Sequence, residues 1–278
     1  MRLMMRNIFA AILLASFALV GAAPGSGQDG QVLLPDQSAA KAKQLLQQAI
    51  QAFGGDVYLN LRDYSCFGKA SQFGHSGDVT GYEKYFDFVK MPDKERTEYS
   101  SKRTIIEIFS GNHGWVMDRG GVSDAPEDSL ARRQDDMNKD LDTILRFRIK
   151  EPGMIFRYAG PDVVDLKEAE WVELVDKAGR TIRIALDKAT HLPLHKVVIT
   201  RDPTTRLKSE EIEYYSNYHP IQGLQTPFQV ASERNGLKTS QVFLDECQYN
   251  TGLEDSLFTK ASLDERWAKV GKKQKKKK

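Results

Sequence analysis

Histidine is the side chain best suited to chemistry near neutral pH, because it can act there as a base, an acid or a metal ligand. The chain has five histidines: His75, His113, His191, His195 and His219. His191 and His195 flank Pro193, which prevents the helical turn that would aim both at one zinc ion. With Asp187 they form a local group that a hydrolytic or metal site could use, but surface turns have the same composition. We therefore interpret these three residues as the polar part of a turn.

The sequence contains none of the common catalytic motifs. It has no HExxH zinc motif, no GxSxG nucleophile turn and no glycine-rich phosphate loop. We therefore predict no catalytic residues, no metal site and no cofactor, and we expect that the protein is not an enzyme.

Cys66 and Cys247 allow one disulfide at most. They are too few for a disulfide scaffold, and their spacing does not fit a zinc site. In an oxidising compartment they could pair, and closing so long a loop is worth ~5 kcal/mol in the chain-entropy model. We expect instead two half-buried thiols without a required disulfide, because both positions lie near opposite ends of the predicted run of strands.

The charge of the chain is unevenly distributed. The formal net charge is +2, but Arg2, Arg6 and the six lysines of residues 272–278 lie near the two ends. Without these eight, 32 Lys and Arg face 38 Asp and Glu, a net charge of −6. Nucleic-acid-binding domains carry a clustered basic face, so the acidic body argues against that class. We interpret residues 269–278 as a basic, disordered tail; attraction of its lysines to anionic lipid is the alternative.

Residues 1–23 have the layout of a secretory signal peptide. Arg2 and Arg6 precede an apolar run, residues 8–20, and small residues follow at 21–23. The run is shorter than the ~20 apolar residues of a membrane-spanning helix. We therefore expect cleavage near Ala22 or Ala23, export of the mature protein, and a linker at residues 24–37.

Hydrophobic periodicity defines the elements of the body. Residues 39–53 have apolar side chains at helical spacing and end at Gly54 and Gly55. From Tyr64 onward the period changes to two, and short turn signals join about eleven antiparallel strands. One amphipathic helix, residues 126–149, interrupts these strands.

We predict one domain, residues 38–268, of mainly β with α structure. Its strongly curved antiparallel sheet forms an open half-barrel, with both helices covering the concave face. Some strands are apolar on both faces, as at Ile105, Ile106, Ile108 and Phe109. Helices on one side would leave the second apolar face in water, so we expect the sheet either to wrap a helix or to enclose an apolar ligand.

Two short segments resemble a known family. Residues 213–228, EYYSNYHPIQGLQTPF, and the Leu257-Phe258-Thr259 segment are similar to the outer-membrane lipoprotein-sorting carriers of the LolA-like superfamily. The order of elements over residues 38–267 is similar too, whereas the basic tail departs from the family. The resemblance implies a periplasmic protein whose curved sheet and helices enclose a cavity for acyl chains.

The resemblance implies a non-enzymatic carrier of lipid or lipoprotein acyl chains. The alternative is an envelope sensor that reports lipid or lipoprotein status to a protein partner, which would be an envelope membrane protein. A carrier needs a dry lining, because each exposed CH₂ group of an acyl chain costs ~0.8 kcal/mol. Helix 126–149 is the candidate lid. The candidate lining residues, each of which could also be core, are Phe86, Phe88, Ile106, Ile108, Trp115, Phe156, Ile182, Ile184, Tyr214 and Phe228.

Overall fold

The computed structural model describes residues 33–202 and 204–275, so the predicted signal peptide lies outside the described residues. Most of the linker and the last three lysines lie outside them as well. None of the helices in this part of the chain has the length and apolarity that a membrane span requires. The helices are α1 (Pro35–Phe53), α2 (Asp56–Leu59), α3 (Glu127–Lys139), α4 (Leu141–Arg146) and α5 (Lys260–Lys275), with 3₁₀ turns η1 (Arg148–Lys150) and η2 (Asp255–Phe258).

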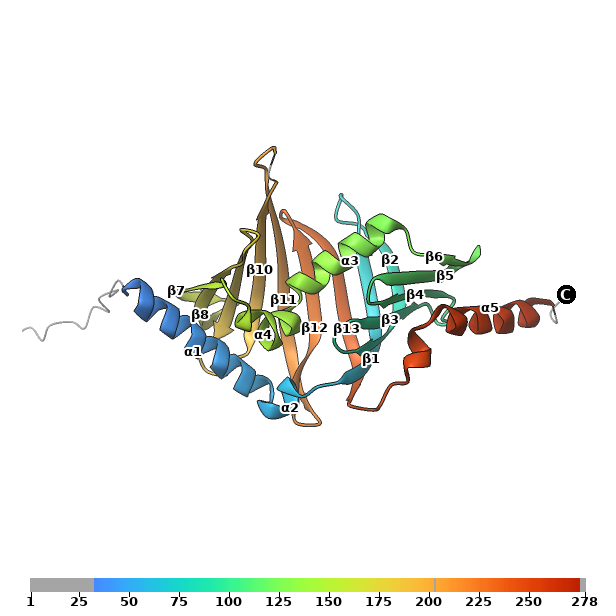
Figure 1. Ribbon diagram of the computed structural model, residues 1–278, viewed down its shortest axis with the longest axis horizontal. Coiled ribbons are helices and arrows are strands. Elements are labelled where there is room, and N and C mark those ends of the chain that lie inside the picture. The colour runs from blue at the N-terminus through green and yellow to red at the C-terminus, as the bar shows by residue number, and fades with distance from the viewer. Residues whose placement is uncertain (1–32, 203, 276–278) are drawn as a thin grey trace, which may run out of the picture. The chain divides into compact units, whose positions relative to one another are not determined.

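Thirteen antiparallel strands form one sheet in the order β6-β5-β4-β3-β2-β1-β13-β12-β11-β10-β9-β8-β7 (Figure 1). Within the described residues, the edge strands β6 and β7 do not pair with each other, so the sheet is open. The strands are β1 (Asp63–Phe73), β2 (Val79–Lys90), β3 (Lys94–Tyr99), β4 (Ile105–Ser110), β5 (His113–Asp118), β6 (Gly121–Asp124), β7 (Ile155–Val164), β8 (Lys167–Val175), β9 (Thr181–Asp187), β10 (Pro193–Arg201), β11 (Lys208–Ile221), β12 (Leu224–Arg234) and β13 (Leu237–Tyr249).

This architecture confirms the predicted fold class, an open antiparallel half-barrel with helices. The number of strands is thirteen rather than about eleven. Short strands such as β6, with four residues and one large apolar side chain, Val122, are too short for alternation to be counted.

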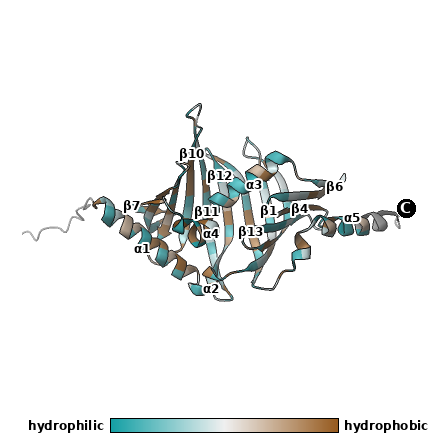
Figure 2. Cartoon of the chain, viewed as in Figure 1, coloured by the Kyte–Doolittle hydropathy of each residue, from teal (hydrophilic) through white to brown (hydrophobic). Residues whose placement is uncertain are grey.

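The inner face of the sheet is the face that carries α1, α3 and α4. Its main core packs the buried stripe of α1, which includes Leu46 and Ile50, and α4 residues Ile144 and Leu145 against β8, β9 and β10. Figure 2 shows apolar and polar residues alternating along α1, as expected for a helix with one buried face. The prediction that both helical segments cover one face of the sheet is confirmed.

Gly54 ends α1 and fixes its position against the sheet. Its φ is 136°, and a Cβ at this position would lie 2.5 Å from the carbonyl oxygen of Gly223, in the β11–β12 turn. Only glycine allows both this backbone conformation and this close approach.

The predicted helix 126–149 is two helices, because the chain turns at Asp140. Asp140 is extended, with φ −61° and ψ 137°, and its carboxylate accepts a hydrogen bond of 2.8 Å from the Thr143 amide. It therefore caps the N-terminus of α4 and separates α4 from α3.

The outer face of β3–β6 is covered by η2 and α5, and the sequence pattern did not predict α5. Phe258 of η2 and Leu263 of α5 are buried against Ile106, Ile108 and Met117. The second apolar face of these strands therefore faces protein, so no enclosed ligand is needed to cover it. The helix also continues to Lys275, into the predicted disordered tail; Lys and Gln are good helix formers and extend a helix that has already begun.

Cys66 and Cys247 form a disulfide, so the prediction of two free thiols is wrong. The two residues are directly opposite each other on β1 and β13, with a Cα–Cα distance of 4.1 Å. The prediction assumed that the first and last strands lie far apart, but they are neighbours in the middle of the sheet.

Candidate functional site

The pairing register assigns the side chains of β1–β5 to the two faces. Directly opposite residues of neighbouring strands project on the same side. One row across β13, β1, β2, β3, β4 and β5 contains Cys247, Cys66, Asp87, Thr97, Glu107 and Val116. The neighbouring row contains Tyr249, Tyr64, Val89, Glu95 and Phe109. Tyr64 and Tyr249 pack against the main core, so both rows belong to the inner face.

Five of the candidate lining residues lie on the outer face. Phe88, Ile108 and Trp115 occupy the row between those two, and Phe86 and Ile106 occupy the next outer row. Four of them pack in the cluster under η2 and α5, and the Phe86 ring lies 4.4 Å from the Arg103 guanidinium. None of the five lines the inner face.

The other five candidates are distributed over several environments. Ile182 and Ile184 are fully buried in the main core, and Phe156 packs against it. Tyr214 lies on the outer face, where its ring is 4.6 Å from His195 and its hydroxyl donates to Glu233 at 2.9 Å. Phe228 is half-buried, with its ring 4.6 Å from His219. The structure does not bring the ten candidates together.

The residues Asp187, His191 and His195 do not converge on one site. His195 Nε2 lies 2.8 Å from Asp165, whereas Asp187 accepts hydrogen bonds from the amides of Ala189 and Thr190. Among the residues that the structure describes, no group of three or more His, Cys, Asp and Glu side chains is placed to hold a metal ion.

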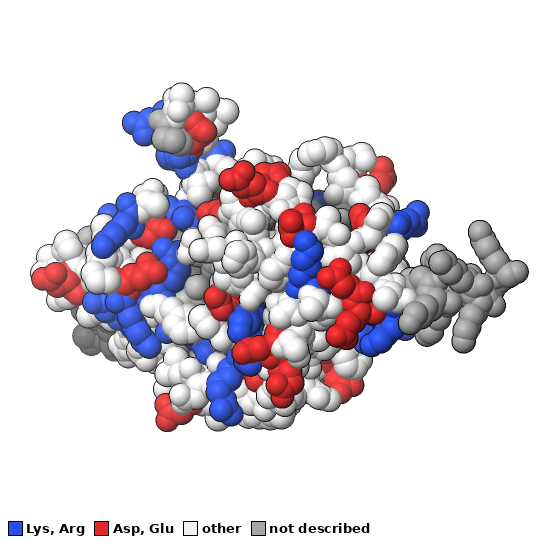
Figure 3. Space-filling model, turned by 45° about the vertical axis from the view of Figure 1, so that its right-hand side comes forward, with Lys and Arg blue, Asp and Glu red and all other residues white. Residues whose placement is uncertain are grey.

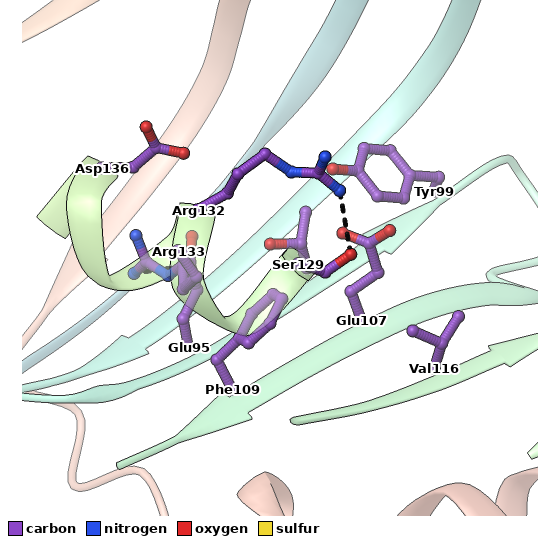
Figure 4. Close-up of a pocket in the computed structure, with 10 residues that line it drawn as sticks. Glu95, Tyr99, Glu107, Phe109, Val116, Ser129, Arg132, Arg133 and Asp136 are labelled. Carbon is purple, nitrogen blue, oxygen red and sulfur yellow. Dashed lines mark hydrogen bonds and ion pairs between the residues drawn. The ribbon is translucent and has the colours of Figure 1, made fainter. Parts of the chain in front are cut away.

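A pocket of about 370 Å³ lies between α3 and the inner face of β3, β4 and β5 (Figure 4). The sequence pattern predicted apolar lining positions on the strands, whereas most residues that line this pocket are polar. The lining residues are Glu95, Thr97, Tyr99, Glu107, Phe109, Val116, Ser129, Arg132, Arg133 and Asp136. The sequence signal for this site was a set of polar side chains at every second position of β3: Glu95, Thr97 and Tyr99.

The charges of the pocket are incompletely balanced. Arg133 forms an ion pair with Glu95. Arg132 bonds to Asp128 at 3.1 Å and to Ser129 at 3.0 Å, both on its own helix. Within residues 33–202 and 204–275, Glu107 has neither a hydrogen-bond nor an ion-pair partner.

Burial shifts the titration of the carboxyl groups on this face. It raises the pKa of Glu107, and it raises the pKa of Glu95 although the Arg133 guanidinium opposes the shift. Burial, followed by the charge of Glu95, raises the pKa of Asp87 well above its usual range. The negative charge concentrated here is therefore poorly solvated.

Half-buried apolar residues form the inner face at the centre of the sheet. Val230, Val242 and Ala70 are successive partners across β12, β13 and β1, and Leu244 lies opposite Gly68. This row continues from Tyr215 of the main core, so it lies on the inner face. We call Ala70, Val230, Val242 and Leu244 the central row.

Helix α3 spans the inner face from β5 to β11 and so passes over the central row (Figure 1). Its first end is tied to β5 by the Ala125 amide, which bonds to the Gly114 carbonyl at 2.8 Å. At its other end, Lys139 Nζ lies 2.9 Å from Glu211 of β11. Lys139 is the one residue of α3 that is buried, and the backbone of α3 packs mainly on α4 rather than on a strand. Polar contacts at both ends, together with the Leu130 side chain against Gly114 of β5, therefore hold α3 over the sheet.

Solved structures of other proteins have the same arrangement of strands and helices. A structure of a DUF1329 family protein from Desulfovibrio piger superposes with a TM-score of 0.58 at 17% identity, covering 80% of this chain and 98% of that one. A candidate outer membrane lipoprotein-sorting protein domain from Vibrio parahaemolyticus gives 0.55 at 13% identity, covering 81% and 99%. A LolA superfamily protein from Nitrosomonas europaea gives 0.52 at 13% identity, covering 80% and 99%. The fold is LolA-like.

The LolA-like fold that the sequence resemblance implied is thus confirmed. A scan of protein-family models and a sequence search of curated proteins found no match. At 17% identity or less, the three structures establish the shared fold alone.

Proposed function

We propose that the protein is an exported, non-enzymatic carrier that holds an acyl chain of a lipid or lipoprotein between α3 and the inner face. The observation that supports this most directly is the position of α3 over the half-buried central row. The likeness to a candidate lipoprotein-sorting domain and the signal-like residues 1–23 also support the proposal, with the periplasm as the compartment.

The central row offers apolar area that the protein itself leaves partly exposed. An acyl chain laid on Val230, Val242 and Leu244 would exclude water from both surfaces and gain ~0.8 kcal/mol per buried CH₂ group. The chain would run beneath α3, along the direction that leads from the main core to the polar pocket.

The two helical segments of the inner face have different roles in this proposal. Helix α4 buries Leu141, Ile144 and Leu145 in the main core, so moving it would expose a large apolar surface. Helix α3 buries only Lys139 and is held by contacts such as Arg133 to Glu95 and Lys139 to Glu211, so moving it would expose much less apolar surface. In the proposal, α3 is the lid that admits the acyl chain, while α1 and α4 stay in place.

In this proposal the acyl chain is lined by the central row and not by the ten candidate residues predicted from the sequence. Ile182 and Ile184 have no exposed surface, so an acyl chain cannot reach them without displacing α1 or α4. Val242 and Leu244 are accessible without such a rearrangement.

Adjacent residues of β13 provide a matched test. Val242 lies on the inner face, whereas Phe243 lies opposite Lys69 on the outer face and is 40% exposed. We expect Val242→Asp to weaken binding of a fluorescent fatty acid at least about tenfold, since the carboxylate would be desolvated by the chain. Phe243→Asp should bind like the wild type.

Circular dichroism of both variants shows whether the fold is kept. Native mass spectrometry of the purified wild type should also detect co-purified lipid. Equal binding by a folded Val242→Asp and the wild type would contradict the proposed position of the acyl chain.

A further inference from the structure

The polar pocket lies beneath the end of α3 that is close to β5. The proposed acyl chain does not account for the charged residues of this pocket. Glu95, Glu107 and Asp136 contribute carboxylates to it, and Arg132 and Arg133 contribute guanidinium groups. Its volume of about 370 Å³ leaves room for a small polar group at the end of the carried chain.

We propose that this pocket binds a zwitterionic head group, an ammonium joined to a phosphate, on the lipid that the protein carries. Glu107 receives the ammonium and Arg132 receives the phosphate. This inference rests on the proposed carrier function and specifies the class of lipid carried.

Glu107 is the residue that would bind the ammonium group. Its carboxylate is half-buried, lines the pocket and lacks a partner among the described residues, so an incoming positive charge would stabilise it. The Tyr99 and Phe109 rings line the same pocket, and aromatic faces attract an ammonium through their quadrupoles.

Arg132 is placed to receive the phosphate. Figure 4 shows its side chain extending from α3 to place the guanidinium near Tyr99 and Glu107. Its side chain is 68% exposed, and its partner Asp128 is 70% exposed. An exposed pair of this kind contributes little, so the guanidinium can exchange Asp128 for a bidentate contact with a phosphate.

The surrounding charges disfavour a purely anionic head group. Glu95 lies on β3, the strand next to Glu107, Asp87 lies one strand further on β2, and Arg133 is already paired with Glu95. A head group that brings only negative charge would face these carboxylates with no ammonium to offset them. Figure 3 shows positive and negative residues interspersed on the visible face, so this face offers no extended basic surface that would attract an anionic head group.

The test compares water-soluble lipids by isothermal titration calorimetry on the full mature chain. Dihexanoyl phosphatidylethanolamine is zwitterionic and dihexanoyl phosphatidylglycerol is anionic, with the same acyl chains. We expect the wild type to bind the zwitterionic lipid at least about tenfold more tightly. Glu107→Gln should abolish this difference, while Glu246→Gln, at an exposed position of β13, should keep it. Equal affinities in the wild type, or unchanged selectivity in Glu107→Gln, would overturn the inference.

Two further measurements distinguish a lipid head group from the free head-group compound, and head-group selectivity from acyl-chain binding. Free phosphoethanolamine should bind much more weakly than the lipid; tighter binding of the free compound would overturn the assignment to a lipid head group. Fatty-acid binding should be the same in Glu107→Gln and the wild type, because the fatty acid has no ammonium. Fatty-acid binding without head-group selectivity would leave the carrier proposal standing and reject this one. Thermal unfolding of Glu107→Gln should show a fold at least as stable as the wild type, since the substitution removes an unpaired charge.

Discussion

The two halves of the sheet use their inner faces in opposite ways. In the β7–β12 half, the inner face carries the main core, which α1 and α4 fill. In the β1–β6 half, the inner face carries Asp87, Glu95 and Glu107, while the buried Ile106, Ile108 and Met117 project outward beneath η2 and α5. The alternation of apolar and polar residues along a strand shows that one face is apolar. The helices that pack on the sheet decide whether that apolar face is the inner or the outer one. One continuous sheet can therefore hold a closed core and an open polar site side by side.

The strongest test of this contrast is a charge placed in the filled half. Ile184 has no exposed surface, and Ile184→Glu would force an unpaired carboxylate into a close-packed core. We expect a loss of more than about 5 kcal/mol, enough to unfold the protein, whereas Val242→Asp on the central row should fold. Circular dichroism and thermal unfolding of both variants measure this. A folded Ile184→Glu would mean that the β7–β12 half contains an accessible cavity.

The disulfide joins β1 to β13, where the two halves of the sheet meet, and its removal should have the next largest effect. Cys66 and Cys247 are 181 residues apart, for which the chain-entropy model gives ~5 kcal/mol. We expect the double Cys→Ser variant to lose a large part of this and to unfold at a clearly lower temperature than the wild type. Adding a reductant to the wild type should reproduce the change. A midpoint within a few degrees of the wild type would show that pairing β1 with β13 suffices without the bond.

The apolar outer face of the β1–β6 half predicts a role for α5 in stability. Leu263 is fully buried against the outer cluster, so Leu263→Ala should cost about 2–4 kcal/mol. Ser256→Ala, at an exposed position of η2, is the control. Denaturant unfolding measures both. An unchanged stability of Leu263→Ala would mean that α5 is not part of the folded core.

The smallest expected effect is the pH-dependent change in stability on replacing Asp142, a buried carboxyl group in the filled half. Burial, followed by the charge of Asp140, raises the pKa of Asp142 to about 6. The pKa of an unfolded aspartate is ~3.9, so the folded state binds more protons between these values and stability falls as pH rises through this range. Asp142→Asn should stabilise the protein by about 1–2 kcal/mol near neutral pH and by much less near pH 4. Asn can still accept the hydrogen bond of 2.7 Å from the Tyr58 hydroxyl. Thermal midpoints at both pH values decide this, and an equal shift at each would contradict the pKa.

Local patterns predicted the elements of this protein well, because local physics determines them. The apolar spacing of residues 39–53 predicted α1, and alternation at Ile182, Ile184 and Leu186 predicted β9 and its buried side. The break at Asp140 was also visible as a helix N-cap, but the apolar spacing on both sides of it suggested one long helix.

The predictions that failed depend on which strands are neighbours. The disulfide requires the pairing of β1 with β13, and the outward direction of Ile106 and Ile108 requires α5 on the outer face. The polar pocket was missed for a related reason. Glu95 and Glu107 resemble ordinary solvent-facing positions of a strand until α3 is placed above them.

The strand order also determines how the chain must assemble. Every neighbouring pair in the sheet joins strands that are consecutive in sequence, except β1 and β13. The pairs within β1–β6 and within β7–β13 can therefore form by short-range loop closure, while the β1–β13 pair needs nearly the whole domain. We expect this pairing to form last, so that the two thiols stay open to oxidants and to wrong partners until β13 has emerged and docked. An exported chain of this topology would thus complete its sheet and oxidise its cysteines only after translocation has ended.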